Sequence, residues 1–296
     1  MNLLHKTGRS ILLRGKAKFV LVFLNGFLFA LLLYFYVEDN YEKNLFQALA
    51  SYVKSESEMK AMAEDSMLLK SLHLVNTIER TRSKIFGNQE INAWKADLIQ
   101  PVTYDLMTGK KACGGFCYVL GRLLRESDVE IRFAQMKVGN EYGKHIVIEA
   151  KTSHGWVVLD PSFDVFFKRP DGQLASFVDV QSDWNYYKQQ LPAGYDLAYN
   201  YGGVRYTNWD KVPVIMPLIK NVMYFTLGKE KTENYSLRNL VLRKFNLLFN
   251  VTLFFYLLLV FVTVRKFLRN RQRAVYLNPN LLFPRRSIEP LMKTTA

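Results

Sequence analysis

Three side chains with the types and spacing needed for thiol chemistry lie in the middle of the chain. Cys117 follows two nearby glycines, His145 lies in the segment GKHIVIEA, and Asp160 ends the segment GWVVLD. A thiol attacks a carbonyl carbon only as the thiolate, so it needs a base, and the base needs a third group to orient it. The three residues therefore predict acyl transfer at a Cys-His-Asp triad.

A helix is predicted to follow directly after a loop over residues 109–115, with Cys117 in its first turn. The prediction rests on apolar residues at helical spacing, which are Phe116, Val119, Leu120, Leu123 and Leu124. Unpaired N–H groups in the first turn lower the pKa of a thiol and can bind the oxyanion of a tetrahedral intermediate. Gly114 and Gly115 let the backbone bend and a substrate come close. Gly115 and Phe116 are therefore candidate substrate contacts.

The base and its orienting group are expected on one hairpin. Together with the preceding helix, three predicted strands indicate an α+β fold, and they span residues 130–138, 145–151 and 156–160. A two-residue loop at 153–154 would place Val147 opposite Asp160. His145 and Asp160 would then be diagonal neighbours, about 7–8 Å apart at Cα, within reach of an imidazole and a carboxylate. Asp160 is thus predicted to orient His145, which in turn pairs with Cys117.

Each of these residues also has a structural interpretation. Cys117 can be a small buried apolar residue, and His145 a strand histidine with its hydrogen bonds satisfied. Asp160 precedes Pro161, where an aspartate is a good turn former. Cys113 falls in the predicted loop and is not expected to be the nucleophile; its alternative role is as a redox partner that would lock Cys117 in a disulfide.

The order of a Cys at a helix start, a strand His and an Asp in WVVLDP resembles the transglutaminase-like superfamily, which is papain-like in architecture. The resemblance covers residues 85–165 and implies a helix packed on an antiparallel sheet. It also implies Cys117 as nucleophile, His145 as general base and acid, and Asp160 as the orienting residue. Bacterial members include cysteine peptidases, amidases and acyltransferases, and some members bind ligands without catalysis. Ile146 departs from the family, because many members carry a small residue and an aromatic after the histidine.

Two apolar runs flank this region and are predicted to be transmembrane helices. Residues 19–37 are interrupted only by Asn25 and Gly26, and residues 245–264 contain no formal charge. A cleavable signal peptide is the alternative for the first run. An uncleaved anchor is favoured because Glu38, Asp39 and Asn40 follow the run and no small-residue cleavage site ends it.

The net charge of +14 is concentrated in the two tails. Residues 1–18 hold five basic and no acidic residues, and residues 265–296 hold eight basic residues and one acidic, which leaves +2 for the rest. This distribution is a topology signal and excludes a nucleic-acid-binding face. It predicts a two-pass membrane protein with both termini cytoplasmic. The resemblance to the transglutaminase-like superfamily, together with the low number of cysteines, implies a bacterial inner membrane. The expected order is a basic N-terminus (1–18), a transmembrane helix (19–37), an extracytoplasmic, periplasmic transglutaminase-like domain (38–244), a second transmembrane helix (245–264) and a basic tail (265–296).

The remaining segments carry weaker signals. Residues 41–82 are predicted to be helical, and residues 278–296 to be disordered. The aromatic-rich segment 165–210 is interpreted as packing of a second lobe, or as a stacking platform for sugar or peptide that includes Trp184 and Tyr187. Residues 212–227 are apolar but contain two prolines, so they are expected to lie on the membrane surface and not to span it.

Two functions follow from these observations. The first is a membrane-anchored thiol enzyme, a cysteine peptidase, amidase or acyltransferase acting on an envelope protein or peptide. The alternative is a non-catalytic accessory or binding subunit of a cell-surface polysaccharide or export assembly, because tethering raises effective concentration beside a membrane partner. A purely structural membrane protein is a third option. No cofactor or metal is expected, since two Cys and four His show no paired zinc-ligand spacing.

Overall fold

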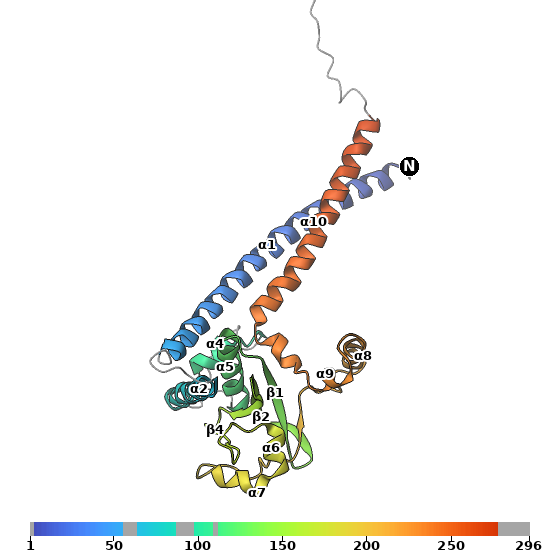
Figure 1. The fold of residues 1–296 in the computed structure, drawn as a ribbon. Coiled ribbons are helices and arrows are strands. Elements are labelled where there is room, and N and C mark those ends of the chain that lie inside the picture. The colour runs from blue at the N-terminus through green and yellow to red at the C-terminus, as the bar shows by residue number, and fades with distance from the viewer. Residues whose placement is uncertain (1–2, 56–63, 87–97, 109–111, 278–296) are drawn as a thin grey trace, which may run out of the picture. The chain divides into compact units, whose positions relative to one another are not determined.

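The chain divides into two compact units in the computed structural model. One unit combines Met1–Phe35 with Leu248–Ala296, and the other is Tyr36–Leu247. The structure describes residues 3–55, 64–86, 98–108 and 112–277, with side chains from Phe19 to Asn270 apart from Ala112 (Figure 1). Part of the predicted loop (109–111) and the tail predicted to be disordered (278–296) lie outside the described residues.

The two apolar runs lie in the two longest helices, α1 (Leu3–Ser55) and α10 (Lys244–Leu277). The stretches Phe19–Ser55 and Lys244–Asn270 are long and apolar enough to cross a membrane. The predicted helices at 19–37 and 245–264 lie inside them. Asn25, which interrupts the first run, donates from Nδ2 to the Leu21 carbonyl at 2.7 Å and approaches Thr263 Oγ1 of α10 at 3.5 Å.

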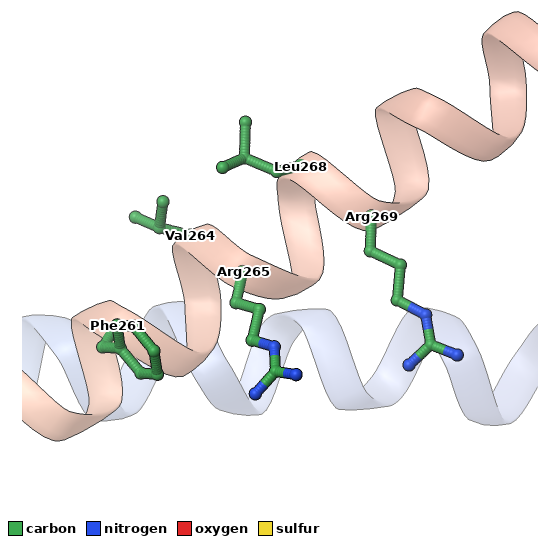
Figure 2. A pocket seen from close by; sticks show the side chains of 5 residues that line it. All are labelled: Phe261, Val264, Arg265, Leu268 and Arg269. Atoms are coloured by element: carbon green, nitrogen blue, oxygen red, sulfur yellow. The ribbon is translucent and has the colours of Figure 1, made fainter.

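The last turns of the apolar part of α10 carry apolar and basic side chains on one face. Phe261, Val264, Arg265, Leu268 and Arg269 line one pocket there (Figure 2). Their spacing of three and four residues makes them neighbours on the helix surface. The change from apolar side chains to arginines therefore occurs within about two turns of one continuous helix.

The larger unit is built on a five-stranded antiparallel sheet, which confirms the α+β class. The strands are β1 (Ile131–Val138), β2 (Glu141–Thr152), β3 (Gly155–Asp160), β4 (Val165–Phe166) and β5 (Val204–Arg205), in the order β4-β3-β2-β1-β5. In the β2–β3 hairpin Lys151 pairs with Trp156 and Ile148 with Leu159. The predicted register and two-residue loop are therefore correct. β2 begins earlier than predicted, because a short turn at Gly139 leads directly into it.

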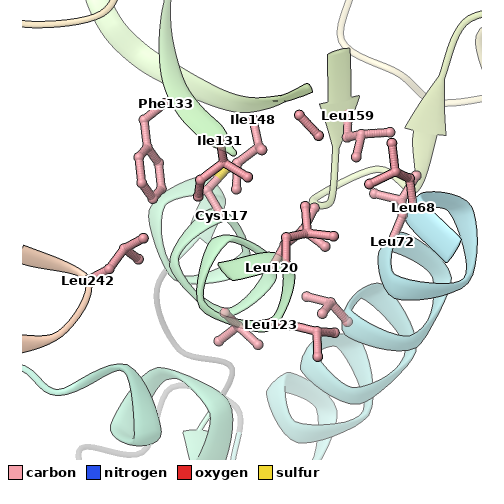
Figure 3. Close-up of a cluster of buried hydrophobic side chains, with 14 of the residues drawn as sticks. Leu68, Leu72, Cys117, Leu120, Leu123, Ile131, Phe133, Ile148, Leu159 and Leu242 are labelled. Atoms are coloured by element: carbon pink, nitrogen blue, oxygen red, sulfur yellow. The ribbon is translucent and has the colours of Figure 1, made fainter. Parts of the chain in front are cut away.

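Side chains alternate between the two faces of this sheet, and each face has its own core. Ile146 and Ile148 point to the helix-side core, and Val147 between them points to the aromatic-side core. The helix-side core is covered by α2 (Glu64–Phe86), α4 (Val102–Thr108) and α5 (Ala112–Glu126). Figure 3 shows part of it. Four residues of the predicted apolar stripe of α5 lie here, which are Val119, Leu120, Leu123 and Leu124, and the fifth, Phe116, is also buried.

The second half of α1 belongs to the helix-side core. Phe46, Ala50 and Val53 are buried in it. Arg122 of α5 is fully buried and contacts Glu42 of α1, with 3.4 Å between Nε and Oε1. It also pairs with Glu126 one turn further along α5. The packing and the charge pairing together fix residues 42–53 of α1 to the domain.

The aromatic-rich segment packs against the opposite face of the sheet, as the packing interpretation predicted. It contains α6 (Phe177–Ser182), α7 (Trp184–Tyr187) and the 3₁₀ turn η1 (Lys188–Gln190). Its buried rings include Phe167, Phe177, Tyr187, Tyr195, Tyr201 and Tyr206. After it come α8 (Ile215–Leu227), α9 (Lys229–Glu233) and the 3₁₀ turn η2 (Leu237–Val241).

A buried polar network joins this segment to the sheet. Glu149 of β2 is fully buried and accepts from Arg132 Nε at 2.9 Å and from the Tyr206 hydroxyl at 2.6 Å. It also accepts from the Phe177 backbone N–H at 3.3 Å. The Arg132 guanidinium is held between the Trp156 and Tyr206 rings, 4.2 and 4.1 Å from their centroids. Every hydrogen bond of this carboxylate therefore crosses between elements.

Replacing Glu149 with alanine should lower the free energy of unfolding by about 3–5 kcal/mol, because it leaves the Arg132 charge buried without its partner. The matched control is Glu141→Ala on the same strand, whose exposed carboxylate pairs only with Lys144; its cost should stay below about 1 kcal/mol. Denaturant unfolding of the full chain in mild detergent, followed by tryptophan fluorescence, measures both. Equal effects of the two variants would contradict a structural role for the network.

Candidate thiol site

The residue at which α5 begins determines which of the two cysteines lies in the first turn of the helix. The helix begins at Ala112, so the predicted loop over residues 112–115 is wrong. Gly114 and Gly115 were interpreted as loop residues because glycine disfavours helices by about 1 kcal/mol each. Burial of the apolar stripe of α5 outweighs this cost. Cys113 consequently lies in the first turn and Cys117 one turn deeper in the helix.

Cys117 is enclosed in the helix-side core. Its side chain is fully buried, and its Sγ donates to the Ile146 carbonyl at 3.0 Å. Figure 3 shows it beside Ile131 and Ile148. Burial raises the pKa of the Cys117 thiol well above its usual value, and the nearby carboxylate of Asp160 adds to this effect. The thiol is therefore held in the unreactive, protonated form.

The predicted contact between Cys117 and the imidazole is wrong, and side-chain alternation explains why. α5 packs on the face to which Ile146 and Ile148 point. His145, one position before Ile146, points to the opposite face. A side chain in the middle of α5 therefore does not reach the ring, whereas the start of the helix lies beside Lys144, the residue before His145.

The predicted pairing of His145 with Asp160 is confirmed. The ring Nε2 lies 2.7 Å from Asp160 Oδ2, and both side chains are almost fully buried. Asp160 Oδ1 also accepts from the Ser162 backbone N–H at 3.1 Å, two residues along the chain. The carboxylate thus orients the imidazole and also forms the turn after Pro161, so the two interpretations of this residue combine.

Cys113 is the thiol that meets the imidazole. It is partly exposed, its Sγ lies 3.9 Å from the Lys144 carbonyl, and its thiol interacts electrostatically with the imidazole of His145, the next residue along the strand. Burial raises the pKa of the Cys113 thiol. Hydrogen bonding to His145 and the positive charge of His145 together lower this pKa by more than burial raises it, so the thiol pKa lies below its usual value. The interaction with His145 that was predicted for Cys117 is therefore made by Cys113.

The protonated imidazole is stabilised in return. Burial lowers the pKa of His145, but the negative charge and hydrogen bond of Asp160, together with Cys113, raise it to about 9. A lowered thiol pKa and a raised imidazole pKa are the two changes that a thiolate–imidazolium pair requires. The unpaired N–H groups at the start of α5 stabilise the same negative sulfur.

Aromatic side chains close the site around the imidazole. The Tyr199 ring stacks on His145, with 4.3 Å between centroids and 9° between planes, and Phe163 meets it edge-on at 5.8 Å. The Tyr195 hydroxyl lies 3.5 Å from Asp160 Oδ2. These rings were not predicted as site residues. Assigning them requires the path of the chain after β3, which brings the aromatic-rich segment onto the face to which His145 points.

The four residues predicted as substrate contacts lie in packing positions. Gly115 and Phe116 are buried along α5, and Tyr187 is buried edge-on against Phe167. Trp184 is half-buried against Tyr201. Tyr187 and Trp184 belong to the aromatic-side core, and among the described residues no ring contact joins any of the four to the His145 ring.

Fold and site together define an α+β protein in which Cys113, His145 and Asp160 follow one another in contact. Comparison with protein-family models, curated proteins and solved structures found no match to this chain. The resemblance to the transglutaminase-like superfamily therefore stays a prediction. With Cys113 in place of Cys117, the order of Cys at a helix start, His on a strand and Asp before Pro161 is retained.

Alkylation of Cys113 should depend on His145 in a defined direction. In the wild type the rate with iodoacetamide should reach half its maximum below pH 9, because the imidazole lowers the thiol pKa. In His145→Gln the positive charge is removed while burial and Asp160 still raise the thiol pKa, so the midpoint should move to higher pH. Mass spectrometry of the peptide containing Cys113 over a pH series measures this, with the exposed His154→Gln as control. Superimposable profiles for wild type and His145→Gln would contradict the pairing.

Proposed function

We propose that this protein is a membrane-anchored thiol enzyme of the transglutaminase-like type, acting as a cysteine peptidase, amidase or acyltransferase. The observation that carries the proposal is the chain of contacts from Cys113 through His145 to Asp160. Such a chain is the arrangement that makes a thiol nucleophilic and then returns a proton to the leaving group. Cys113 takes the role that sequence analysis gave to Cys117.

The acylation step follows from the geometry. The Cys113 thiolate attacks the carbonyl carbon of an amide and forms an S–C bond, and the carbonyl electron pair moves to oxygen. Backbone N–H groups in the first turn of α5 stabilise this oxyanion. The His145 imidazolium donates its proton to the departing amine as the C–N bond breaks. The product is a thioester on Cys113 with a neutral imidazole held by Asp160.

In deacylation His145 acts as the base, whereas in acylation it acts as the acid. Neutral His145 takes a proton from water or from an acceptor amine, which attacks the thioester carbonyl. The S–C bond breaks and Cys113 leaves as the thiolate, so the starting ion pair is restored. Water as acceptor makes the protein a peptidase or amidase, and an amine makes it an acyltransferase. Tyr199 and Phe163 limit access of bulk water to the imidazole.

We further propose that α1 and α10 anchor the domain in a bacterial inner membrane, with the domain periplasmic and both termini cytoplasmic. The support is their length and apolar composition together with the basic residues beyond both outer ends. An envelope protein or peptide is then the substrate within reach. Alkaline phosphatase fused after residue 296 should be inactive and a fusion within residues 229–236 should be active; the reverse pattern would contradict this topology.

The most direct test of the enzyme proposal is covalent labelling by an epoxide of the papain-inhibitor type. Intact and peptide mass spectrometry of the full chain in mild detergent should show one adduct, on Cys113. The control is Cys113→Ala, which should give no adduct although Cys117 is retained. An adduct on Cys117, or none on folded wild-type protein, would contradict an activated thiol at Cys113.

The alternative, a non-catalytic accessory subunit of a polysaccharide or export assembly, is favoured by one observation. His145 is only 2% exposed and carries Tyr199 stacked on its ring. An imidazole covered in this way would serve as a structural polar group in a binding module. In that case Cys113→Ala should keep full function in cells and still co-purify with a membrane partner, whereas the enzyme proposal predicts loss of function with this variant.

A further inference from the structure

A second site, on the β1–β5 edge of the sheet, is a cavity of about 440 Å³. Its walls come from α5, β1, β2, β5, the loop before α8, the start of α8 and η2. Arg205, Lys211 and Arg238 line it together with Tyr118, Gln135 and Met216. The volume lies in the range of small-ligand sites.

The cavity holds three positive charges and no negative one among its described lining residues. None of the three cations forms an ion pair with a described residue. Asp210 precedes Lys211 in the chain but is exposed and does not line the cavity. Like charges gathered in one concave site repel one another and raise the local positive potential, so a bound anion would relieve the repulsion.

Neutral hydrogen bonds hold the two guanidinium groups in place and leave part of each free. Arg205 donates from Nε to Gln135 Oε1 at 3.3 Å and from Nη2 to the Tyr142 carbonyl at 3.4 Å. Arg238 donates from Nη1 to the Tyr118 hydroxyl at 2.8 Å. Among described residues, Arg205 Nη1 and Arg238 Nε and Nη2 have no acceptor. Positioned guanidinium groups with free N–H donors match the oxygens of a phosphate group.

The neighbouring helix indicates where such a phosphate would come from. Met216 lines the cavity and lies in the first turn of α8, which has no buried residue. Large apolar side chains of α8 face solvent, with Phe225 93% exposed. Val241, also in the cavity wall, is three residues before α10 begins, a distance of about 10 Å at most. An exposed apolar helix beside a cationic cavity, next to a proposed membrane helix, is the arrangement of a lipid-binding surface.

We propose that this cavity binds a phosphate group, with the headgroup of an anionic phospholipid as its source and α8 lying in the membrane interface. The lipid source rests on the membrane insertion of α10 put forward under the proposed function, but not on the thiol chemistry. The phosphate oxygens take the free N–H donors of Arg205 and Arg238 and the ammonium of Lys211. The acyl chains of the same lipid lie against the exposed apolar side chains of α8.

Calorimetric titration of the full chain in mild nonionic detergent tests the proposal with three matched probes. These are dioctanoyl phosphatidic acid, glycerol 3-phosphate, which has the same headgroup without acyl chains, and dioctanoylglycerol, which lacks phosphate. Arg205→Gln and Arg238→Gln should each weaken phosphatidic acid binding about tenfold, the value of one charge-assisted hydrogen bond. Lys211→Gln, which removes an exposed side chain at no cost to folding, should weaken it about threefold. Lys188→Gln, outside the cavity, should leave it unchanged.

The outcomes distinguish a phospholipid headgroup from a free phosphate ester as the source of the bound phosphate. Tighter binding of phosphatidic acid than of glycerol 3-phosphate, sensitive to these variants, supports the lipid site. Equal, variant-sensitive binding of the two supports the phosphate site and overturns the lipid source. Phosphatidic acid binding that Lys211→Gln and Arg238→Gln leave unchanged, or equal binding of dioctanoylglycerol, overturns the proposal. Epoxide labelling of Cys113 is a separate readout, so failure here and failure of the thiol enzyme are distinguishable.

Discussion

Replacing Cys113 with alanine should abolish turnover while leaving the fold intact. The thiol is partly exposed in the first turn of α5, so its removal should cost no more than about 1 kcal/mol of unfolding free energy. Loss of a nucleophile that acts as a unit with its base should lower kcat by at least about a thousandfold. The measurement is turnover of a peptide amide, alongside denaturant unfolding of the same preparation.

Cys117→Ala is the matched control, because the same atom is removed one helical turn away. It deletes a buried group from the helix-side core and a hydrogen bond to the Ile146 carbonyl. It should therefore cost about 1–3 kcal/mol of stability and leave the turnover of folded protein unchanged. If turnover followed Cys117 and not Cys113, the assignment of the nucleophile would be wrong.

Asp160→Asn should reduce turnover by about two to four orders of magnitude. The substitution removes the negative charge that raises the His145 pKa to about 9, so the imidazole becomes neutral at lower pH. The Cys113 thiol then loses its positive neighbour, which raises its pKa. This effect exceeds the direct loss of the Asp160 charge, because His145 influences the thiol more strongly than Asp160 does. Asparagine keeps the acceptor for the Ser162 N–H, so the turn should survive. Iodoacetamide alkylation of Cys113 against pH should show a higher midpoint in this variant.

The same substitution should change how stability depends on pH. A histidine whose folded pKa is raised above its unfolded value of 6.5 stabilises the fold fully below pH 6.5, and this contribution is lost as pH rises toward 9. Wild-type unfolding free energy should fall over that window relative to Asp160→Asn. If the difference between the two proteins were constant from pH 6 to pH 9, the raised imidazole pKa would be refuted. Glu64→Gln, whose carboxylate is fully exposed, is a control for general charge effects.

The hairpin could be predicted from sequence because its information is local. A two-residue loop at 153–154 fixes every pair from Thr152 and Gly155 outward, and the alternation of strand side chains then sets the face of His145 and Asp160. Those two rules were enough to bring the imidazole and the carboxylate together. The second face of the sheet and its aromatic cover could not be assigned to the site without knowing how the chain returns after β3.

The cysteine near His145 could not be assigned from local rules, because Gly114 and Gly115 made the start of α5 look like a loop. Helix propensity places the boundary after Gly115, whereas the tertiary burial of Phe116 and Leu120 extends the helix back to Ala112. A shift of four residues is one helical turn, so it replaces one cysteine by the other at the same angular position. The sheet face to which His145 points indicates which cysteine is near the ring. Because α5 packs on the opposite face of the sheet, a cysteine in the middle of α5 is kept away from the imidazole.

The burial of Phe46, Ala50 and Val53 bears on how this protein can be separated from its anchor. Cutting the chain after Ser55 would take these three residues and Glu42 away from the structure they complete, leaving Arg122 without one of its counter-ions. A protease acting there should therefore yield an unstable fragment and not a released, working domain. Any soluble form has to retain the chain from about Tyr36 onward, because the domain unit begins at that residue.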